Sequence, residues 1–335
     1  MHNSGRRILR WIRKALLWSL VALLVALVVG AIYQAIATEI DQREAFPGPG
    51  EMVDVGEHRL HLNCLGQGNP TVVLDGGWGY TSVEWSGWVQ SEVANHTRVC
   101  AYDRAGTGWS EPGPSPLDAN RVASELHTLL QEADEEGPYV LVGHSLAGLY
   151  SRIYAERYPE EVSGMVLVDS THPDQFEGSG LALTMNRVVG IVGPLIAWAG
   201  IPRVFDLYPS HPELPPLQRE QSDSLYYRTP HQVAMFEEMG TIPESMEKAR
   251  GTGTLGKKPL VVVSAADHDA QTGALQEELT SLSSNSSMRV VEGSTHSSVV
   301  VDRDHARQTS ASILEVVEAV RSDQPLTQPS TPSDE

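Results

Sequence analysis

The stretch PYVLVGHSLAG, residues 138–148, decides the fold of this chain. Its first half is apolar and predicts a short buried strand, and the residues after Ser145 predict a helix. A strand that turns directly into a helix holds the serine in a strained backbone conformation, and small neighbours leave room for the turn. Gly143 and Ala147 are such neighbours, although Ala147 stands where a second glycine is usual. The stretch indicates a nucleophile elbow, but it also fits a serine at the start of an ordinary helix.

Acidic residues and a histidine follow in an order that favours the elbow. Residues 258–264 predict a buried parallel strand that leads to Asp267 and Asp269. His296 comes after a further short strand, 288–291, and before a helix expected over about 302–321. Serine, acid and histidine in this chain order are the arrangement of a hydrolytic triad.

Two further segments extend the pattern. Residues 71–79, TVVLDGGWG, predict a strand followed by a glycine-rich loop, and residues 99–110 read VCAYDRAGTGWS. With these segments the chain resembles the α/β-hydrolase superfamily from Val53 to Arg321. In the first loop Asp75 replaces the histidine common in that superfamily.

The resemblance implies an α/β fold with a mostly parallel eight-stranded sheet, helices on both faces and an inserted helical cap. The core would comprise residues 51–171 and 257–321, and the cap residues 172–256. An ordinary connection between a strand and a helix has about 2–6 residues, so this insertion is long.

The resemblance also implies a serine hydrolase in which Ser145 attacks and His296 is the general base. Asp267 is ranked first as the acid that orients His296. Asp269 and Asp169 are the alternatives, because each also follows a predicted strand and each equally fits a turn or cap residue.

An oxyanion hole is expected near the elbow. It would be formed by the backbone N–H groups of Leu146 and Gly77, with Trp78 as the alternative to Gly77. A glycine pair such as that at positions 76 and 77 also marks plain turns.

The N-terminal segment predicts a membrane anchor. Residues 1–14 carry five basic side chains, and the uncharged residues 15–37 would span roughly 35 Å as a helix. The basic side chains place that end in the cytoplasm, so the catalytic domain would lie outside the cytoplasm after a linker over residues 38–50. A cleaved signal peptide ending at the small-residue site Ala35-Ile36-Ala37, which would give a secreted enzyme, is the alternative.

The two cysteines fit an oxidising compartment. In the superfamily the second strand, here residues 58–64, runs antiparallel beside the fourth, here residues 98–102. That pairing would bring Cys64 and Cys100 together in a disulfide, and two buried thiols are the alternative.

Composition narrows the classes of partner and cofactor that the chain is expected to bind. The formal net charge is −19, and removing the five positive charges of the first 14 residues leaves −24 for the rest. Nucleic acid is therefore not expected as a partner. The chain contains no phosphate-loop or metal-ligand motif, so no cofactor or metal is expected. Residues 322–335 are polar and proline-rich and predict a disordered tail.

The cap should select the substrate. Residues 181–198 are apolar and suggest a hydrophobic pocket for an ester, a helix buried on the core, or a bilayer contact. A second membrane span is disfavoured by Arg187 and by a helix break at Gly193-Pro194. A polar helix is expected over about 229–251.

The sequence thus predicts a membrane-anchored carboxylesterase or lipase-like enzyme acting on small or lipid-like esters. The alternatives are an amide, thioester or carbon–carbon bond hydrolase with the same triad, and a ligand-sensing protein with slow turnover. Epoxide hydrolases and haloalkane dehalogenases of this fold need a carboxylate nucleophile, which Ser145 excludes.

Overall fold

A single eight-stranded sheet forms the centre of the molecule, and the computed structural model describes residues 2–44, 47–176, 178–207 and 210–326. The strand order is β1-β2-β4-β3-β5-β6-β7-β8. β2 pairs antiparallel with β1 and β4, and the other neighbours are parallel. The predicted eight-stranded, mostly parallel sheet is confirmed. The strands are β1 (Glu51–Asp54), β2 (Arg59–Leu65), β3 (Val72–Asp75), β4 (Val99–Tyr102), β5 (Tyr139–His144), β6 (Val162–Val168), β7 (Leu260–Ala265) and β8 (Ser286–Val291).

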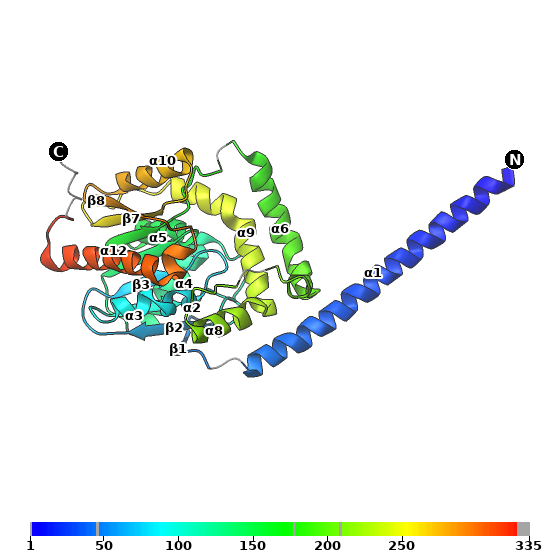
Figure 1. Cartoon of the computed structure of the whole chain (residues 1–335), viewed down its shortest axis with the longest axis horizontal. Coiled ribbons are helices and arrows are strands. Elements are labelled where there is room, and N and C mark those ends of the chain that lie inside the picture. The colour runs from blue at the N-terminus through cyan, green and yellow to red at the C-terminus, as the bar shows by residue number, and fades with distance from the viewer. Residues whose placement is uncertain (1, 45–46, 177, 208–209, 327–335) are drawn as a thin grey trace.

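Helices cover both faces of this sheet (Figure 1). Successive side chains of a strand point to opposite faces, so a strand buried on both sides reads as a continuous apolar run. In β3, Val73 packs in one core cluster and Leu74 in the other. The first cluster includes α4 (Ala119–Glu132) and α5 (Ala147–Arg157). The second cluster is covered by α2 (Ser82–Gly87), α3 (Val89–Val93), α11 (Ser298–Val301) and α12 (Arg303–Ser322).

The described residues between β6 and β7 form four helices: α6 (Gly180–Trp198), α7 (Ile201–Val204), α8 (Pro216–Tyr226) and α9 (Thr229–Arg250). Helices α6 and α9 pack closely, because Gly190 and Gly240 face each other and a Cβ at Gly190 would collide with the Gly240 backbone. Helix α6 continues through Pro194, so the break expected at Gly193-Pro194 is wrong. The remaining elements are α10 (Ala270–Glu278) and two 3-10 turns, Pro159–Glu161 and Leu279–Leu282.

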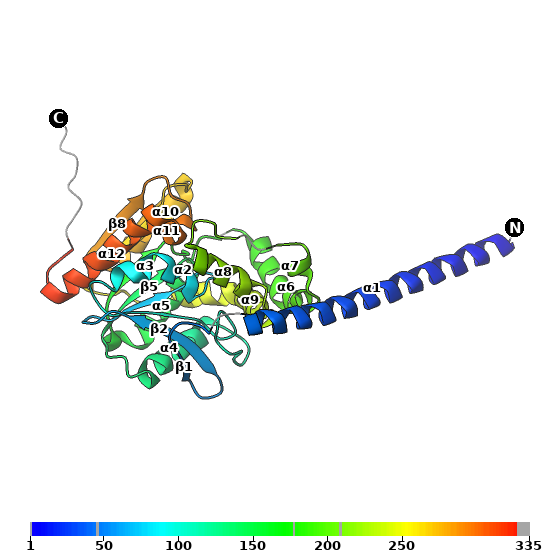
Figure 2. The same ribbon diagram turned by 60° about the horizontal axis from the view of Figure 1, so that its bottom comes forward.

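Helix α1 (His2–Glu44) projects away from the body of the molecule (Figures 1 and 2). Side chains of residues 7–29 are exposed, and contact with the body begins at Gly30. The helix also continues through residues 38–44, which the sequence suggested as part of a linker. Helix α1 therefore reaches the body without a non-helical linker before Glu44.

A disulfide and a buried residue near the C-terminus make two further contacts with the core. Cys64 and Cys100 lie opposite each other in the β2–β4 pair and form a disulfide. At the other end of the chain, Leu326 is buried and its backbone N–H donates to the Asn285 side chain. Of the expected disordered tail, residues 322–325 are exposed and Leu326 is packed against the body, and residues 327–335 lie outside the described part of the chain.

Candidate active site

Ser145 occupies the sharp turn between β5 and α5. Its φ is 53°, which places a residue with a side chain in the left-handed region. The Ser145 N–H donates to the Val168 carbonyl at 3.0 Å, and the Ser145 carbonyl accepts from Gly148 and Thr171. A Cβ at Gly148 would collide with the Ser170 side chain, which explains why glycine is needed at position 148.

His296 lies beside Ser145 and connects it to a buried carboxylate. Nε2 of His296 is 3.0 Å from the Ser145 hydroxyl, and Nδ1 is 2.5 Å from Oδ2 of Asp169. The Asp169 side chain is 1% exposed, whereas that of His296 is 49% exposed. With Nδ1–H donating to Asp169, Nε2 is left to accept the serine proton.

The first-ranked acid of the sequence analysis, Asp267, is not placed against His296. Asp267 and Asp269 are exposed, and the Asp269 carboxylate accepts from the Thr272 N–H as the N-cap of α10. β6 and β7 are parallel neighbours, so their carboxyl ends meet at one edge of the sheet. Asp169, one of the two alternatives to Asp267, directly follows β6 and reaches His296 from that edge.

Several donors stabilise Asp169 as a carboxylate. Its Oδ1 accepts from the Ala265 N–H at 2.8 Å and lies 2.6 Å from Nε2 of His268. Burial alone would raise the pKa of Asp169, but hydrogen bonds from His296, Ala265 and His268 lower it to about 2. His268 is not among the residues that the sequence predicts for the site, since its position beside Asp267 gives no indication of this contact.

The residue before the serine, His144, supports the same site from beneath. It is buried, and its Nε2–H donates to the His296 carbonyl at 2.9 Å. Burial, together with the neighbouring His296 ring, lowers the pKa of His144 to about 3. His144 is therefore neutral, and its hydrogen bond fixes the loop that carries His296.

A glycine-rich loop after β3 approaches the elbow. A Cβ at Gly77 would lie 2.9 Å from the Ser145 Cβ, so only glycine fits there. Arg104 donates to the Gly76 carbonyl at 2.6 Å and to the Gly77 carbonyl at 2.9 Å. In a trans peptide N–H and C=O point in opposite directions, so the N–H groups of Gly77 and Trp78 point away from Arg104.

Arg104 is held by two buried carboxylates. It lies 2.5 Å from Asp75, at the end of β3, and 2.5 Å from Glu238, on cap helix α9. Burial, only partly offset by Arg104 and Tyr102, raises the pKa of Asp75 to about 6. Asp75 thus pairs with Arg104 within the core, and the pair of Arg104 with Glu238 links the glycine loop to helix α9.

A cavity of about 470 Å³ opens over Ser145 and His296. This volume is within the range of small-molecule sites, about 300–1,000 Å³. Its apolar lining includes Trp78, Phe176, Met239 and Ile242, and its polar lining includes Thr171, Gln175, Asn186, Thr272 and Gln276. The indole N–H of Trp78 donates to the Met235 carbonyl of α9 at 2.7 Å.

A larger cavity of about 520 Å³ lies between α1 and α9. Its lining includes none of the three residues Ser145, His296 and Asp169.

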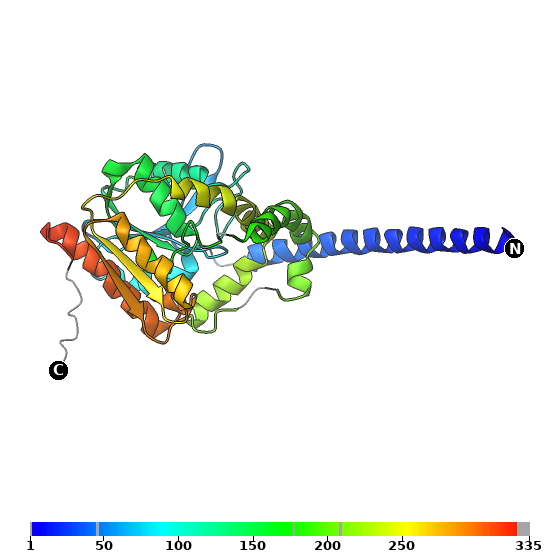
Figure 3. The same cartoon turned by 90° about the horizontal axis from the view of Figure 1, so that it is seen from above.

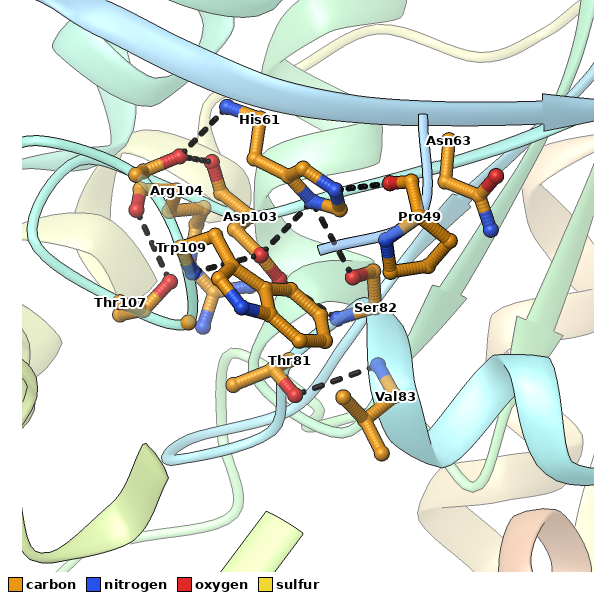
Figure 4. A network of polar contacts seen from close by, with 12 residues as sticks. Pro49, His61, Asn63, Thr81, Ser82, Val83, Asp103, Arg104, Thr107 and Trp109 are labelled. Atoms are coloured by element: carbon orange, nitrogen blue, oxygen red, sulfur yellow. Dashed lines mark hydrogen bonds and ion pairs between the residues drawn. The ribbon is translucent and has the colours of Figure 1, made fainter. Parts of the chain in front are cut away.

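A second cluster of serine, histidine and aspartate side chains is structural (Figure 4). Nδ1 of His61 faces Asp103 at 2.9 Å and Ser82 at 3.4 Å, while its Nε2 contacts the Pro49 carbonyl. Both ring nitrogens are therefore occupied, and none is left to take a proton from a serine. Asp103 also accepts from the backbone N–H groups of Ser82 and Trp109, which fixes the loop before α2 and the loop after β4.

Comparison with known proteins supports the family. Residues 70–298 match the family model for the alpha/beta hydrolase fold. An uncharacterised protein of Schizosaccharomyces pombe is 33% identical over 192 residues, covering 48% of this chain and 35% of that protein. The 2-hydroxy-6-oxo-2,4-heptadienoate hydrolase of Pseudomonas putida is 34% identical over 123 residues, covering 36% and 44%. The chain thus matches less than half the length of each of these two relatives.

The fold is also that of a solved enzyme structure. An esterase from Thermogutta terrifontis superposes with a TM-score of 0.62 at 20% identity, covering 82% of this chain and 99% of the esterase. Together with the match over residues 70–298, this shows that the chain belongs to the alpha/beta hydrolase fold family.

Proposed function

We propose that the protein is a membrane-anchored serine hydrolase that cleaves apolar carboxylic esters through an acyl-enzyme on Ser145. The observation that carries this proposal is the hydrogen-bonded series Ser145, His296 and Asp169 beneath the 470 Å³ cavity. A serine hydroxyl is a weak nucleophile at neutral pH, and a neighbouring histidine held in one tautomer activates it.

In the acylation step, Oγ of Ser145 bonds to the ester carbonyl carbon and its proton passes to Nε2 of His296. The carbonyl oxygen becomes an oxyanion, which the N–H groups of Leu146 and Gly77 stabilise, with Trp78 as the alternative donor. The tetrahedral intermediate then breaks its bond to the alcohol oxygen, and His296 returns the proton to that oxygen. A water molecule then gives a proton to Nε2 of His296 while its oxygen bonds to the acyl carbon, and this second tetrahedral intermediate breaks its bond to Oγ of Ser145. The acid is released, and His296 returns the proton to Oγ of Ser145.

The lining of the cavity supports an ester with an apolar acyl or alcohol part. Trp78, Phe176, Met239 and Ile242 offer apolar contacts, whereas the described residues that line the cavity include no lysine or arginine to bind an anionic substrate. An amide, thioester or carbon–carbon bond would use the same triad, and the Pseudomonas putida relative is named as a hydrolase of a heptadienoate.

Anchoring through α1 is supported by its exposed apolar residues and by its contact with the cap. Nε2 of Gln34 donates to the Tyr227 carbonyl at 2.7 Å and to the Thr229 hydroxyl at 3.1 Å. Cleavage after Ala37 would remove Gln34 from this contact, which favours a retained anchor over a signal peptide. The basic residues before position 15 support a catalytic domain outside the cytoplasm.

The test is hydrolysis of p-nitrophenyl esters of increasing acyl length by the full chain in detergent, beside its Ser145→Ala variant. The proposal expects multiple turnover that disappears in the variant, with an optimum chain length that reports the size of the cavity. A single slow burst would indicate a sensing protein, and turnover only of amides, thioesters or carbon–carbon bonds would indicate the other hydrolase classes.

A further inference from the structure

The apolar segment of α1 is longer than the part of it that stands clear of the body. Residues 15–37 carry no charge, but the unbroken run of exposed residues within them is 15–29, before contact begins at Gly30. Fifteen residues span about 22 Å at 1.5 Å each, less than the roughly 30 Å of a hydrocarbon core. With Lys14 at the cytoplasmic boundary, the core extends to about residue 34. Part of the cap that contacts α1 at Gly30 therefore lies at the depth of the bilayer.

The contact at that depth is closely packed and fixed. A Cβ at Gly30 would collide with the Ala199 carbonyl, so the corner between α6 and α7 fits directly against α1. Further along α1, Nε of Arg203 donates to Oε1 of Gln34 at 3.0 Å, and Arg203 also pairs with Asp41. The cap cannot move along α1 without breaking these contacts.

Helix α6 presents an apolar outer face at this level. We call the outer cap face the exposed apolar side chains of α6 and of the turn that ends α7, namely Leu181, Met185, Val188, Ile191, Val192, Leu195, Trp198, Val204 and Phe205. Leu181 is 78% exposed and Ile191 76% exposed. The spacing of three and four residues places the α6 members on one side of the helix. Arg187, the charged residue of α6, pairs with Glu244 at 2.9 Å.

The direction of α6 suits the plane of a membrane. By length and composition α6 could cross a bilayer, but it packs along α9 and runs across the direction of α1 (Figures 1 and 3). Gly30 lies four residues, about 6 Å, inside the boundary estimated at residue 34. Amphipathic helices that lie in a membrane surface bury their apolar face about 5–10 Å deep.

We propose that the outer cap face lies in the outer leaflet of the bilayer beside α1, and that the catalytic cavity takes membrane-resident amphiphilic esters. This inference rests on the proposed anchor and hydrolase activity. The opposite side of α6 supports it, because Asn186 lines the catalytic cavity together with Phe176 from the loop before the helix. Helix α6 thus carries most of the outer cap face on one side and lines the cavity over Ser145 with its other side.

A fluorescent label tests the location of this face. The two cysteines form the disulfide, so an introduced cysteine provides the thiol for labelling. The full chain carrying Ile191→Cys is labelled with an environment-sensitive dye in phosphatidylcholine vesicles that contain nitroxide lipids. Val290→Cys is the matched control, since Val290 is 50% exposed on β8, on the side of the molecule away from α1 (Figure 1).

The inference expects nitroxide quenching at position 191 and none at position 290. If the label at position 191 is not quenched although the chain stays in the vesicles after carbonate extraction, the inference is overturned. If that unquenched label also has a blue-shifted emission, the outer cap face is covered by protein rather than by lipid, and the inference is again overturned. Release of the chain by carbonate would overturn the anchor and the inference together.

Activity separates the substrate part of the inference from the proposed chemistry. Ile191→Glu with Leu195→Glu should lower hydrolysis of a long-chain ester embedded in vesicles by about tenfold or more, because charge is costly in the bilayer. Hydrolysis of water-soluble p-nitrophenyl acetate should be unchanged, and Val290→Glu should alter neither rate. Equal rates on the embedded ester would overturn the inference. If the unsubstituted chain hydrolyses neither ester through Ser145, the proposed function is overturned. In that case the quenching of the label still decides whether the outer cap face lies in the bilayer.

Discussion

Oδ2 of Asp169 lies 2.5 Å from Nδ1 of His296, on the side of the ring opposite Ser145. The Asp169 side chain is almost wholly buried and its other oxygen is occupied by Ala265 and His268. This placement makes the carboxylate after β6, rather than that after β7, the group that orients His296.

Asp169→Asn should therefore lower kcat by about three to four orders of magnitude, because an amide cannot hold the imidazole in the required tautomer. The two exposed carboxylates provide matched controls, and Asp267→Asn and Asp269→Asn should keep most of the activity. Ester hydrolysis by the three purified variants checks this. Full activity of Asp169→Asn would contradict the assignment.

Arg104 should act as a positioning residue for the glycine loop. Arg104→Lys keeps a charge between Asp75 and Glu238 but loses the fork that binds the Gly76 and Gly77 carbonyls together. We expect kcat to fall by about tenfold to a hundredfold with KM changed little, since losing one oxyanion donor outright costs about a hundred- to a thousandfold.

The control for Arg104 is Arg98→Lys. Arg98 pairs with Glu135 and is no lining residue of the catalytic cavity, so this variant should keep the kcat of the unsubstituted enzyme. An unchanged kcat in Arg104→Lys would show that the loop is held by its other contacts.

The buried pair of His61 and Asp103 should make stability depend on pH. Burial opposes a charge on His61, but Asp103 outweighs it and raises the pKa of His61 above 6.5. A raised pKa in the folded state gives stability that is fully present below about pH 6.5 and is lost as pH rises through the folded-state value.

The stabilising effect of His61, measured as the loss of Tm in His61→Gln, should accordingly be larger at about pH 5.5 than at about pH 8.5. The exposed His96 gives the control, because His96→Gln should change Tm little at either pH. A loss of Tm in His61→Gln that is the same at both values would contradict the charged pair.

The disulfide should contribute measurably to stability. Cys64 and Cys100 are 36 residues apart, and the chain-entropy relation for a loop of that size gives about 4 kcal/mol. Replacing both cysteines by alanine should lower the free energy of unfolding by about 2–4 kcal/mol, measured by urea denaturation. A double variant as stable as the unsubstituted chain would show that the pairing of β2 with β4 holds these strands together without the disulfide.

The sequence was sufficient for the fold and for two of the three residues of the proposed triad, because strand patterns and chain order are local information. Ser145 and His296 are identified by the segments that precede them. The acid is different, since Asp169 and Asp267 both follow parallel strands that end at the same edge. Asp169 directly follows β6 and has a φ of 44°, whereas Asp267 lies two residues beyond the end of β7. The strand ends and the backbone conformation after them, which the sequence does not give, decide which carboxylate reaches His296.

Contacts between distant segments were the other part that the sequence could not supply. The ion pair of Arg104 with Glu238 joins residues 134 positions apart, and Gln34 contacts Thr229 across 195 positions. Helix α6 also continues through Pro194 although a proline removes a backbone hydrogen bond. Its close packing on α9 through Gly190 and Gly240 offsets that loss.

The most direct test of the central claim is the covalent intermediate itself. The full chain is mixed with a p-nitrophenyl ester, quenched in acid within the first turnover, and its mass and peptides are measured. The proposed function predicts one acyl group per chain, on the peptide that contains Ser145, and none in Ser145→Ala. An acyl group on another residue, or product formation that persists in Ser145→Ala, would contradict it.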